Sequence, residues 1–291
     1  MKVLVTGSNG QLGKALKIFM PNQFKVFFLD RNNFDLTNPQ NCINTIDQIK
    51  PDWIINAAAF TNVDNAEKNE ELAFKINSEV PFLIANHLES LGSRFIFIST
   101  DFVFNGKKTT PYKIFDKVFP VNAYGRSKAS GEKKCLSLKN TYILRTSWVY
   151  GNEGKNFLNN MYSLFLNHKT NNPPIGVVND QIGCPTNVYK LASVCWKLIQ
   201  NHELLLNTKI LHWSDGGETT WYEFACEINE LLFKRKLLKN KITLVPISFK
   251  DYKRKAICPN YSKLDSSITC KLLDYKQNHW KKELVKVISN F

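Results

Sequence analysis

Residues 1–13 read MKVLVTGSNGQLG, a short apolar strand pattern that runs directly into glycines spaced three apart. From Gln11 onward the apolar residues take the spacing of a helix. A glycine-rich turn between a first strand and a helix is the pattern of dinucleotide-binding folds. Gly7 permits the tight turn, Gly10 lets the backbone approach a pyrophosphate, and Gly13 lets helix and strand pack closely. Because the helix N-terminus faces the anion, we expect a nucleotide to bind here.

Strand-like and helix-like segments alternate downstream of this turn through the first half of the chain. This alternation predicts an α/β fold, a doubly wound parallel sheet of the Rossmann type with helices on both faces. We expect strands at residues 2–6, 25–30, 53–57, 94–99 and 142–145, helices that begin near Gln11, Asn38, Ala66 and Tyr124, and a further helical stretch over 77–91 with Pro81 near its first turn.

The alternation loosens after residue 151. We expect helices over 157–166, 190–201 and 221–233, an apolar pair at 177–178 and a strand over 209–213. The predicted organisation is a dinucleotide-binding domain of residues 1–150, to which residues 185–213 return, and a smaller, discontinuous α/β substrate lobe of residues 151–184 and 214–291.

The composition excludes several classes of protein. The chain has 291 residues, of which 43% are hydrophobic, enough for a substantial core. We see no signal peptide and no apolar run long enough to span a membrane, so we expect a soluble, cytoplasmic protein. The seven cysteines form no Cys-x-x-Cys pair and the five histidines show no metal-ligand spacing. We therefore predict neither disulfides nor a metal site.

The formal net charge of +14 raises the question of an anionic partner. Denser basic stretches occur at residues 234–241 and 250–255, but apolar residues interrupt them. We interpret these stretches as solvated faces rather than a nucleic-acid surface, and expect no nucleic-acid partner. A basic protein also attracts a phosphorylated cofactor and substrate.

Further residues are candidates for holding the nucleotide. Asp30 ends the second predicted strand, where a carboxylate can bind an unmodified ribose, whereas Arg31 can bind a 2′-phosphate. NADH and NADPH therefore both stay open as cofactors. Asp35-Leu36 offer a polar and an apolar contact for adenine, and the small side chains of Ala57, Ala58 and Ala59 would let a cofactor lie against the backbone. With Gly7, Gly10, Gln11, Leu12 and Gly13, these residues make up the predicted nucleotide site.

Tyr124 and Lys128 are four residues apart, on one face of a predicted helix. A neighbouring ammonium favours the charged form of a tyrosine, so we expect Lys128 to lower the pKa of Tyr124, and also to bind cofactor ribose hydroxyls. Thr100 lies at the end of a predicted strand, where α/β sheets place ligands, and could donate a hydrogen bond to a substrate carbonyl. Tyr-x-x-x-Lys alone is a weak pattern. The presence of Thr100 at a strand end and of the glycine-rich turn makes a catalytic role for this pair more specific.

Motifs along most of the chain, in order, resemble those of the extended short-chain dehydrogenases, and among them the dTDP-4-dehydrorhamnose reductases. The resemblance rests on residues 7–13 (GSNGQLG), 56–59 (NAAA), 99–106 (STDFVFNG), 124–128 (YGRSK) with Gly131-Glu132, 145–151 (RTSWVYG), 156–157 (NF), 180–186 (DQIGCPT) and 221–225 (WYEFA).

The resemblance implies reduction of the 4-keto group of a dTDP-6-deoxy-L-hexulose to dTDP-L-rhamnose, with NADPH or NADH as the hydride source. Catalysis would fall to Thr100, Tyr124 and Lys128. Asp101 would sit beside the sugar and Trp148 would pack on it. Asn77 matches the position of a structural helix asparagine of the family. Asn156, Asp180 and Gln181 match motif positions whose contacts the sequence does not define. Of these three we take Asn156 as a candidate for substrate binding. We expect a monomer or homodimer.

The chain departs from the family pattern at two positions. Phe102 stands where the family often has tyrosine, and Cys258 stands where an arginine is expected before proline, with Arg254 or Lys255 as possible replacements. A related 4-keto sugar nucleotide therefore stays open as the substrate. A further alternative is a non-catalytic regulatory subunit that resembles the methionine adenosyltransferase beta subunit, although the Thr100, Tyr124 and Lys128 set argues against it.

Overall fold

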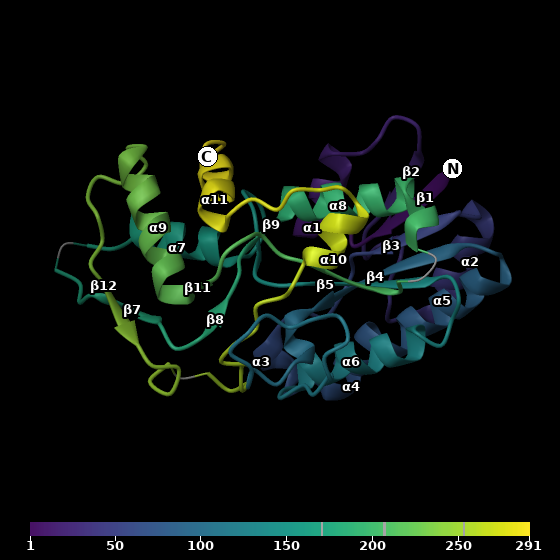
Figure 1. Cartoon of the computed structure of the whole chain (residues 1–291), viewed down its shortest axis with the longest axis horizontal. Helices are drawn as coiled ribbons and strands as arrows, with labels where there is room; N and C mark the ends of the chain where they lie inside the picture. The colour runs from purple at the N-terminus through teal and green to yellow at the C-terminus, as the bar shows by residue number, and fades with distance from the viewer. Residues whose placement is uncertain (170, 206–207, 253) are drawn as a thin grey trace.

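The computed structural model describes residues 1–169, 171–205, 208–252 and 254–291; Lys253, in the basic stretch 250–255, lies outside this range. A six-stranded parallel sheet in the order β10-β5-β4-β3-β1-β2 forms its centre (Figure 1). The strands are β1 (Lys2–Thr6), β2 (Lys25–Leu29), β3 (Trp53–Asn56), β4 (Arg94–Thr100), β5 (Thr141–Thr146) and β10 (Ile210–Trp213). The predicted parallel sheet is confirmed, and the strand at 209–213 belongs to it.

Helices cover both faces of this sheet because its buried strands carry apolar residues on alternate sides. The helices are α1 (Gln11–Ile18), α2 (Pro39–Ile49), α3 (Val63–Ala66), α4 (Glu70–Phe74), the π-turn η1 (Lys75–Glu79), α5 (Val80–Ser90), α6 (Ala123–Cys135) and α8 (Val188–Gln200), with short 3₁₀ turns η2 (Asp101–Val103) and η3 (His202–Leu205). One face packs α1 and α8, and the other packs α2, α5 and α6.

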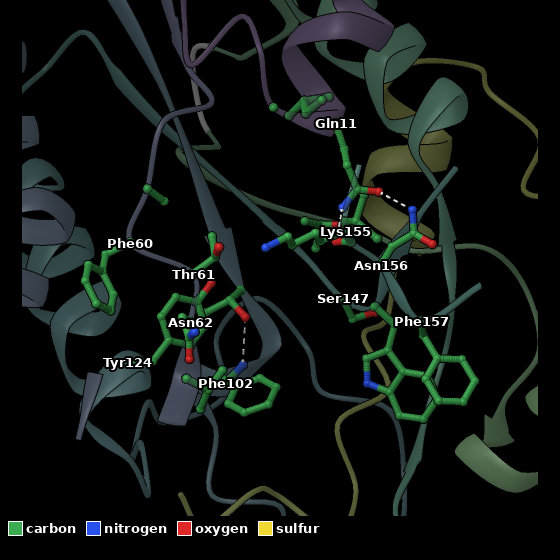
Figure 2. A pocket seen from close by; sticks show the side chains of 18 of the residues that line it. Gln11, Phe60, Thr61, Asn62, Phe102, Tyr124, Ser147, Lys155, Asn156 and Phe157 are labelled. Atoms are coloured by element: carbon green, nitrogen blue, oxygen red, sulfur yellow. Dashed lines mark hydrogen bonds between the residues drawn. The ribbon is translucent and has the colours of Figure 1, made fainter. Parts of the chain in front are cut away.

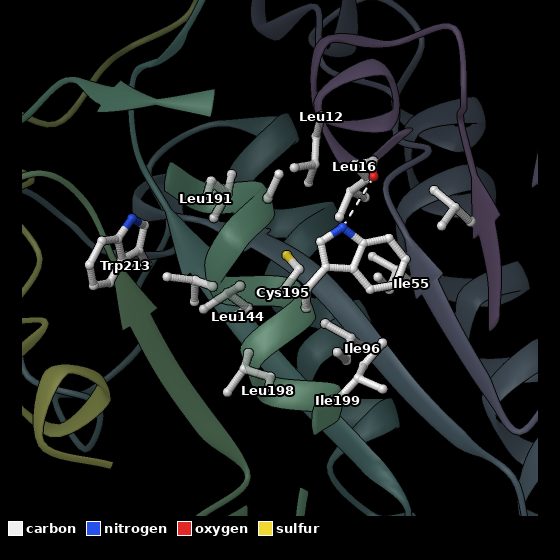
Figure 3. Close-up of a cluster of buried hydrophobic side chains, with 14 of the residues drawn as sticks. Leu12, Leu16, Ile55, Ile96, Leu144, Leu191, Cys195, Leu198, Ile199 and Trp213 are labelled. Carbon is white, nitrogen blue, oxygen red and sulfur yellow. Dashed lines mark hydrogen bonds between the residues drawn. The ribbon is translucent and has the colours of Figure 1, made fainter. Parts of the chain in front are cut away.

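The contact between α1 and α8 is shown in Figure 3. Leu12 and Leu16 of α1 pack with Leu191 and Cys195 of α8 over the sheet. The indole of Trp196 adds a hydrogen bond to the carbonyl of Leu16 at 3.1 Å. Residues far apart in the chain therefore hold the helix that follows the glycine-rich turn.

One predicted helix is wrong in its position. A helix was expected to begin near Ala66, but α3 ends at Ala66 and α4 begins four residues later. The Asn62 side chain accepts a hydrogen bond from Asn65 N and so starts α3 earlier than the apolar pattern indicates.

A smaller lobe lies at the other end of the molecule (Figure 1). Its elements are α7 (Phe157–Leu166), α9 (Trp221–Lys234), α11 (Trp280–Ile288) and the short strands β6 (Val149–Tyr150), β7 (Ile175–Val178), β8 (Ile182–Gly183), β9 (Thr186–Asn187), β11 (Thr219–Thr220) and β12 (Leu244–Ile247). These three helices share one buried apolar cluster. The remaining helix, α10 (Ser267–Leu272), packs back onto β10.

Two surface properties bear on possible partners. Among the described residues, no helix combines the length and the apolar character that crossing a membrane requires. The basic stretch 234–241 is largely exposed, with Lys234 and Lys241 both paired to Glu230. It is a solvated face, as the sequence predicts.

Candidate active site

A cavity of about 1160 Å³ runs from the glycine-rich turn, along the carboxyl ends of the strands, to the smaller lobe. This is the edge at which open α/β sheets bind their ligands. All of the predicted site residues line it except Gly13: Gly7, Gly10, Gln11, Leu12, Asp30, Arg31, Asp35, Leu36, Ala57, Ala58, Ala59, Thr100, Asp101, Tyr124, Lys128, Trp148 and Asn156.

The glycine-rich turn has the shape that a dinucleotide pyrophosphate needs. Gly7 has φ +65°, and a Cβ there would lie 2.8 Å from Ala58 N. A Cβ on Gly13 would fall against the carbonyl of Gly7, so this glycine serves close packing of helix on turn. Gly10 precedes α1 without any side-chain cap, which leaves the N–H groups of its first turn for an anion. These residues fit a nicotinamide dinucleotide.

The end of the cavity where we expect the adenosine ribose carries one acidic and one basic side chain, Asp30 and Arg31. Asp30 accepts hydrogen bonds from Asn9 Nδ2 at 2.8 Å and from Asn32 N at 3.0 Å. The Arg31 side chain is 80% exposed, with its Nε 3.7 Å from Asp35 Oδ1. A backbone hydrogen bond from Thr37 is the largest cause that holds the pKa of Asp35 below its usual value. The geometry is compatible with NADH and with NADPH.

Tyr124 and Lys128 both line the cavity from the first turns of α6, and Figure 2 shows Tyr124 there. Lys128 is only 2% exposed, and its Nζ donates to Ile98 O at 2.6 Å and lies 3.9 Å from the centroid of the Phe97 ring. Burial lowers the pKa of Lys128 to about 7. The lysine is therefore costly to charge in its site.

The expectation that the pKa of Tyr124 lies below its ordinary value is wrong, and Lys128 is not among the groups that shift it. Burial raises the pKa of Tyr124 to about 12, and only a hydrogen bond from Thr100 acts the other way. The expectation failed because desolvation of a phenolate cannot be read from a four-residue spacing. At neutral pH Tyr124 is a neutral phenol, which is the form that can donate a proton.

Thr100 and Asp101 end β4 beside Tyr124. The Thr100 hydroxyl accepts a hydrogen bond from Phe102 N at 3.2 Å and donates one to Asp101 Oδ1 at 3.1 Å. Asp101 is almost fully buried, and burial raises its pKa to about 6, although the hydroxyls of Ser262 and Thr100 lower it in part. Phe102 packs edge-on against Tyr124, with ring centroids 5.8 Å apart.

Buried polar contacts fix α6 in place. Asn77 exchanges two hydrogen bonds with the backbone of Phe60 and donates a third to Ser127 Oγ at 3.0 Å. One turn beyond Lys128, Glu132 forms a two-pronged ion pair with Arg145 of β5, at 2.9 and 2.6 Å. Asn77 thus has the structural place that the resemblance implies, and the ion pair ties α6 to the sheet.

Trp148 and Trp221 form the aromatic part of the opposite side. Their rings stack with centroids 3.4 Å apart and an interplanar angle of 7°. Trp148 has φ +45°, an unusual conformation for a bulky residue, and a Cβ on Gly183 would lie 2.7 Å from its indole. Trp221 covers one face of the Trp148 indole and Gly183 lies against that indole. The two stacked rings therefore form one aromatic surface on the cavity wall.

Asn156 holds the loop that joins the two ends of the cavity. Its amide donates to Gln11 Oε1 at 2.9 Å and to Gly151 O at 3.0 Å, and its oxygen caps α7 through Asn159 N. Gln11 also donates to the carbonyl of Lys155 at 3.2 Å. The Lys155 side chain extends into the cavity in Figure 2.

Several residues of the cavity were not assigned to the site from the sequence. Lys155, Gln181, Trp221, Phe249 and Arg254 all line it. Gln181 and Trp221 stand in the motifs that carry the family resemblance, which could have pointed to them. Arg254 was named only as a possible replacement for the arginine expected at Cys258, Lys155 directly precedes the motif at 156–157, and Phe249 comes from a segment without a recognisable pattern.

The remaining motif positions have other surroundings. Asp180 does not line the cavity, and its carboxylate accepts from Phe249 N at 2.9 Å. Cys258 is buried, whereas the nearby Arg254 pairs with Asp64 at 3.0 Å on the cavity wall. Within the described residues, no three His, Cys, Asp or Glu side chains gather so as to hold a metal ion.

Comparison with known proteins gives one consistent result. The family model described as "RmlD substrate binding domain" matches residues 1–291. A dTDP-4-dehydrorhamnose reductase from Aggregatibacter actinomycetemcomitans is 35% identical, over 98% of both chains. The spore coat polysaccharide biosynthesis protein SpsK of Bacillus subtilis is also 35% identical, over 97% of this chain and 95% of that protein.

Solved structures agree with these sequences. A dTDP-4-dehydrorhamnose reductase from Clostridium acetobutylicum superposes with a TM-score of 0.90 at 34% identity, over 100% of this chain and 99% of that chain. The Bacillus anthracis dTDP-4-dehydrorhamnose reductase, solved in complex with NADP, superposes with a TM-score of 0.90 at 33% identity, over 100% of this chain and 99% of that chain. The chain therefore belongs to the RmlD substrate binding domain family, the family of the dTDP-4-dehydrorhamnose reductases.

Proposed function

We propose that this protein is an oxidoreductase that reduces the 4-keto group of dTDP-4-dehydro-6-deoxy-L-mannose (dTDP-4-dehydrorhamnose) to dTDP-L-rhamnose, with NADPH or NADH, in nucleotide-sugar and polysaccharide biosynthesis. One observation carries the proposal: Thr100, Tyr124 and Lys128 line the same cavity as a glycine-rich turn shaped for a dinucleotide. The names of the related proteins supply the substrate. They do not favour a non-catalytic regulatory subunit.

The dinucleotide, when bound, supplies the hydride. Gly7, Gly10 and Gln11 would hold its pyrophosphate at the N-terminus of α1. Lys128 would donate from Nζ to its ribose hydroxyls. Asp30 and Arg31 would contact the adenosine ribose, and Asp35 and Leu36 the adenine.

Tyr124 and Thr100 act on the sugar. When substrate is bound, the Thr100 O–H would turn from Asp101 Oδ1 to the carbonyl oxygen and so orient and polarise it. Tyr124 then gives its phenolic proton to the oxygen as that oxygen becomes an alkoxide. A phenol whose pKa is raised to about 12 by burial is still a stronger acid than an ordinary alcohol, so transfer of its proton to the alkoxide is favourable.

The two ends of the cavity suggest which parts of the chain bind the cofactor and which bind the substrate. We propose that residues 1–150 and 185–213 bind the dinucleotide and that residues 151–184 and 214–291 form the substrate lobe, which includes Asn156 and Trp221. Trp148 stands at the end of the first range, next to this lobe, and stacks on Trp221. The stacked Trp148 and Trp221 support this division, because an aromatic surface suits the apolar face of a deoxysugar. A cytoplasmic location and a homodimer stay predictions.

The proposal is tested by supplying dTDP-4-dehydro-6-deoxy-L-mannose and following the absorbance of NADPH and of NADH in parallel reactions. We expect oxidation of at least one cofactor and a dTDP-L-rhamnose product identified by mass and NMR. A lack of oxidation with both cofactors would overturn the proposal. The ratio of the two kcat/KM values also decides the choice that Asp30 and Arg31 leave open.

A further inference from the structure

Four basic side chains line the cavity: Arg31, Lys128, Lys155 and Arg254. Arg31 and Arg254 lie beside aspartate carboxylates, and Lys128 donates to a backbone carbonyl. The exposed side chain of Lys155 takes part in no hydrogen bond or ion pair with the other residues that the structure describes. Lys155 is therefore a cation of the cavity wall whose charge these residues leave free for a ligand.

The loop of residues 151–156, which carries Lys155, is tied to the first residue of α1. Gln11 Nε2 donates to the carbonyl of Lys155 at 3.2 Å, and Asn156 Nδ2 donates to Gln11 Oε1 at 2.9 Å. At Gly154, which has φ +80°, a Cβ would lie 2.7 Å from Gln11 Cγ, so the loop backbone runs directly along this side chain. These contacts hold the backbone of Lys155 at the end of the cavity where α1 begins.

The two charged side chains of this loop have different surroundings. Glu153 pairs with Lys14 of α1 at 2.5 Å, so its carboxylate is occupied, and neither residue of this pair lines the cavity. The Lys155 side chain instead extends from the Gln11 end into the cavity, as Figure 2 shows. The loop thus turns its acidic group away from the cavity and its basic group into it.

A pyrophosphate bound at the N-terminus of α1 needs more positive charge than the helix supplies. The pyrophosphate of a dinucleotide carries about two negative charges, whereas a helix N-terminus offers about half a positive charge. Lys14, the basic residue of the first turn of α1, is already paired with Glu153. The ammonium of Lys155 is a compact point charge that suits phosphate oxygens, and the backbone of Lys155 is bonded to this same turn.

We propose that Lys155 is a cofactor-binding residue, whose ammonium pairs with the pyrophosphate of the bound dinucleotide from the side of the smaller lobe. This inference rests on the proposed function. The anchoring of the loop to Gln11 favours the pyrophosphate of the cofactor over the diphosphate of the sugar nucleotide, because Gln11 begins the helix that faces the cofactor. Lys155 therefore joins the cofactor to a loop of the lobe that we propose for the substrate.

The experiment measures dissociation constants of NADP⁺ and of dTDP by calorimetry for the wild type, Lys155→Met, Lys155→Glu and Lys155→Arg. Lys17→Met is the matched control, because Lys17 is an exposed lysine of α1 that does not line the cavity. We expect Lys155→Met to weaken NADP⁺ about tenfold, as loss of one charge-assisted hydrogen bond does, and to leave dTDP unchanged. Lys155→Glu should weaken NADP⁺ further, Lys155→Arg should retain most of the affinity, and the control should match the wild type.

The melting temperature without ligand separates ligand binding from a structural role. Since the Lys155 side chain has no partner among the described residues, Lys155→Met should melt with the wild type, whereas a lysine that supports the fold would lower the melting temperature. Unchanged NADP⁺ binding in Lys155→Met and Lys155→Glu, or weakening of dTDP alone, would overturn the inference. A wild type that binds neither NADP⁺ nor NADPH would count against the proposed function itself.

Discussion

The two walls of the cavity hold their side chains in different ways. In the sheet wall, which we define as Thr100, Asp101, Tyr124 and Lys128, all residues but the partly exposed Tyr124 are buried, and polar contacts behind the wall hold it in place. The lobe wall, defined as Trp148, Lys155, Asn156 and Trp221, is more open apart from Asn156, and it meets the glycine-rich turn through Gln11 and Asn156. The wall that we propose for proton transfer is therefore the more desolvated and the more fixed, whereas the wall that we propose for ligand recognition is more accessible.

The largest effect should come from the sheet wall. Tyr124→Phe removes the proton donor without changing the shape of the site, so we expect kcat to fall by about 10²–10⁴-fold. NADPH binding should stay nearly intact. Tyr142→Phe is the matched control, because Tyr142 packs on Trp53 outside the cavity. Turnover by Tyr124→Phe at the control's rate would reject the assigned donor.

The second-largest effect should come from the Glu132–Arg145 ion pair behind the sheet wall. Arg145→Met leaves Glu132 buried without its partner, so we expect the free energy of unfolding to fall by about 3–5 kcal/mol in urea denaturation. Replacing both residues, Arg145→Met with Glu132→Leu, should recover most of this loss.

A matched comparison comes from an exposed ion pair that joins α1 to the loop before α7. Lys14 and Glu153 lie 2.5 Å apart with side chains about half exposed, and Lys14→Met should cost less than about 1 kcal/mol. Equal losses from Arg145→Met and Lys14→Met would break the contrast between the walls.

A smaller and more selective effect is expected on the lobe wall. Trp221→Ala removes the ring stacked on Trp148, so we expect the KM for the sugar nucleotide to rise about three- to tenfold through loss of aromatic packing. The KM for the cofactor should change little, whereas the melting temperature should fall, because Trp221 also packs against the apolar cluster of the smaller lobe. A kcat loss as large as that of Tyr124→Phe would show that this wall takes part in the chemistry.

The smallest effect concerns pH. Burial lowers the pKa of Lys128 to about 7, so between pH 7 and its ordinary value of 10.5 the unfolded chain binds more protons than the folded one. The stability contributed by this residue must therefore rise with pH above 7. Buried thiols act oppositely above about pH 9, which confines the test to pH 7–8.5. Lys128→Met should show a flatter rise of unfolding free energy than the wild type, and parallel slopes would contradict this.

The sequence predicted the sheet half of the molecule well because that half is governed by local patterns. A glycine-rich turn needs particular glycines, and the alternation of strands and helices follows from side-chain periodicity. Helix boundaries were less secure, as α3 shows, because one side-chain cap from Asn62 moved its start. The small substrate-side strands carry only two to four residues each, too few for any periodicity to identify them.

What the sequence by itself determined is the Rossmann sheet and the nucleotide turn, since both follow from short-range patterns, whereas the proposed set of Thr100, Tyr124 and Lys128 needed the family resemblance as well. Only the tertiary structure decided the pKa of Tyr124, the stacking of Trp148 on Trp221 and the presence of the predicted site residues along one cavity. The physical reason is that burial and contact depend on segments separated by tens of residues or more, which fold brings together and spacing does not reveal.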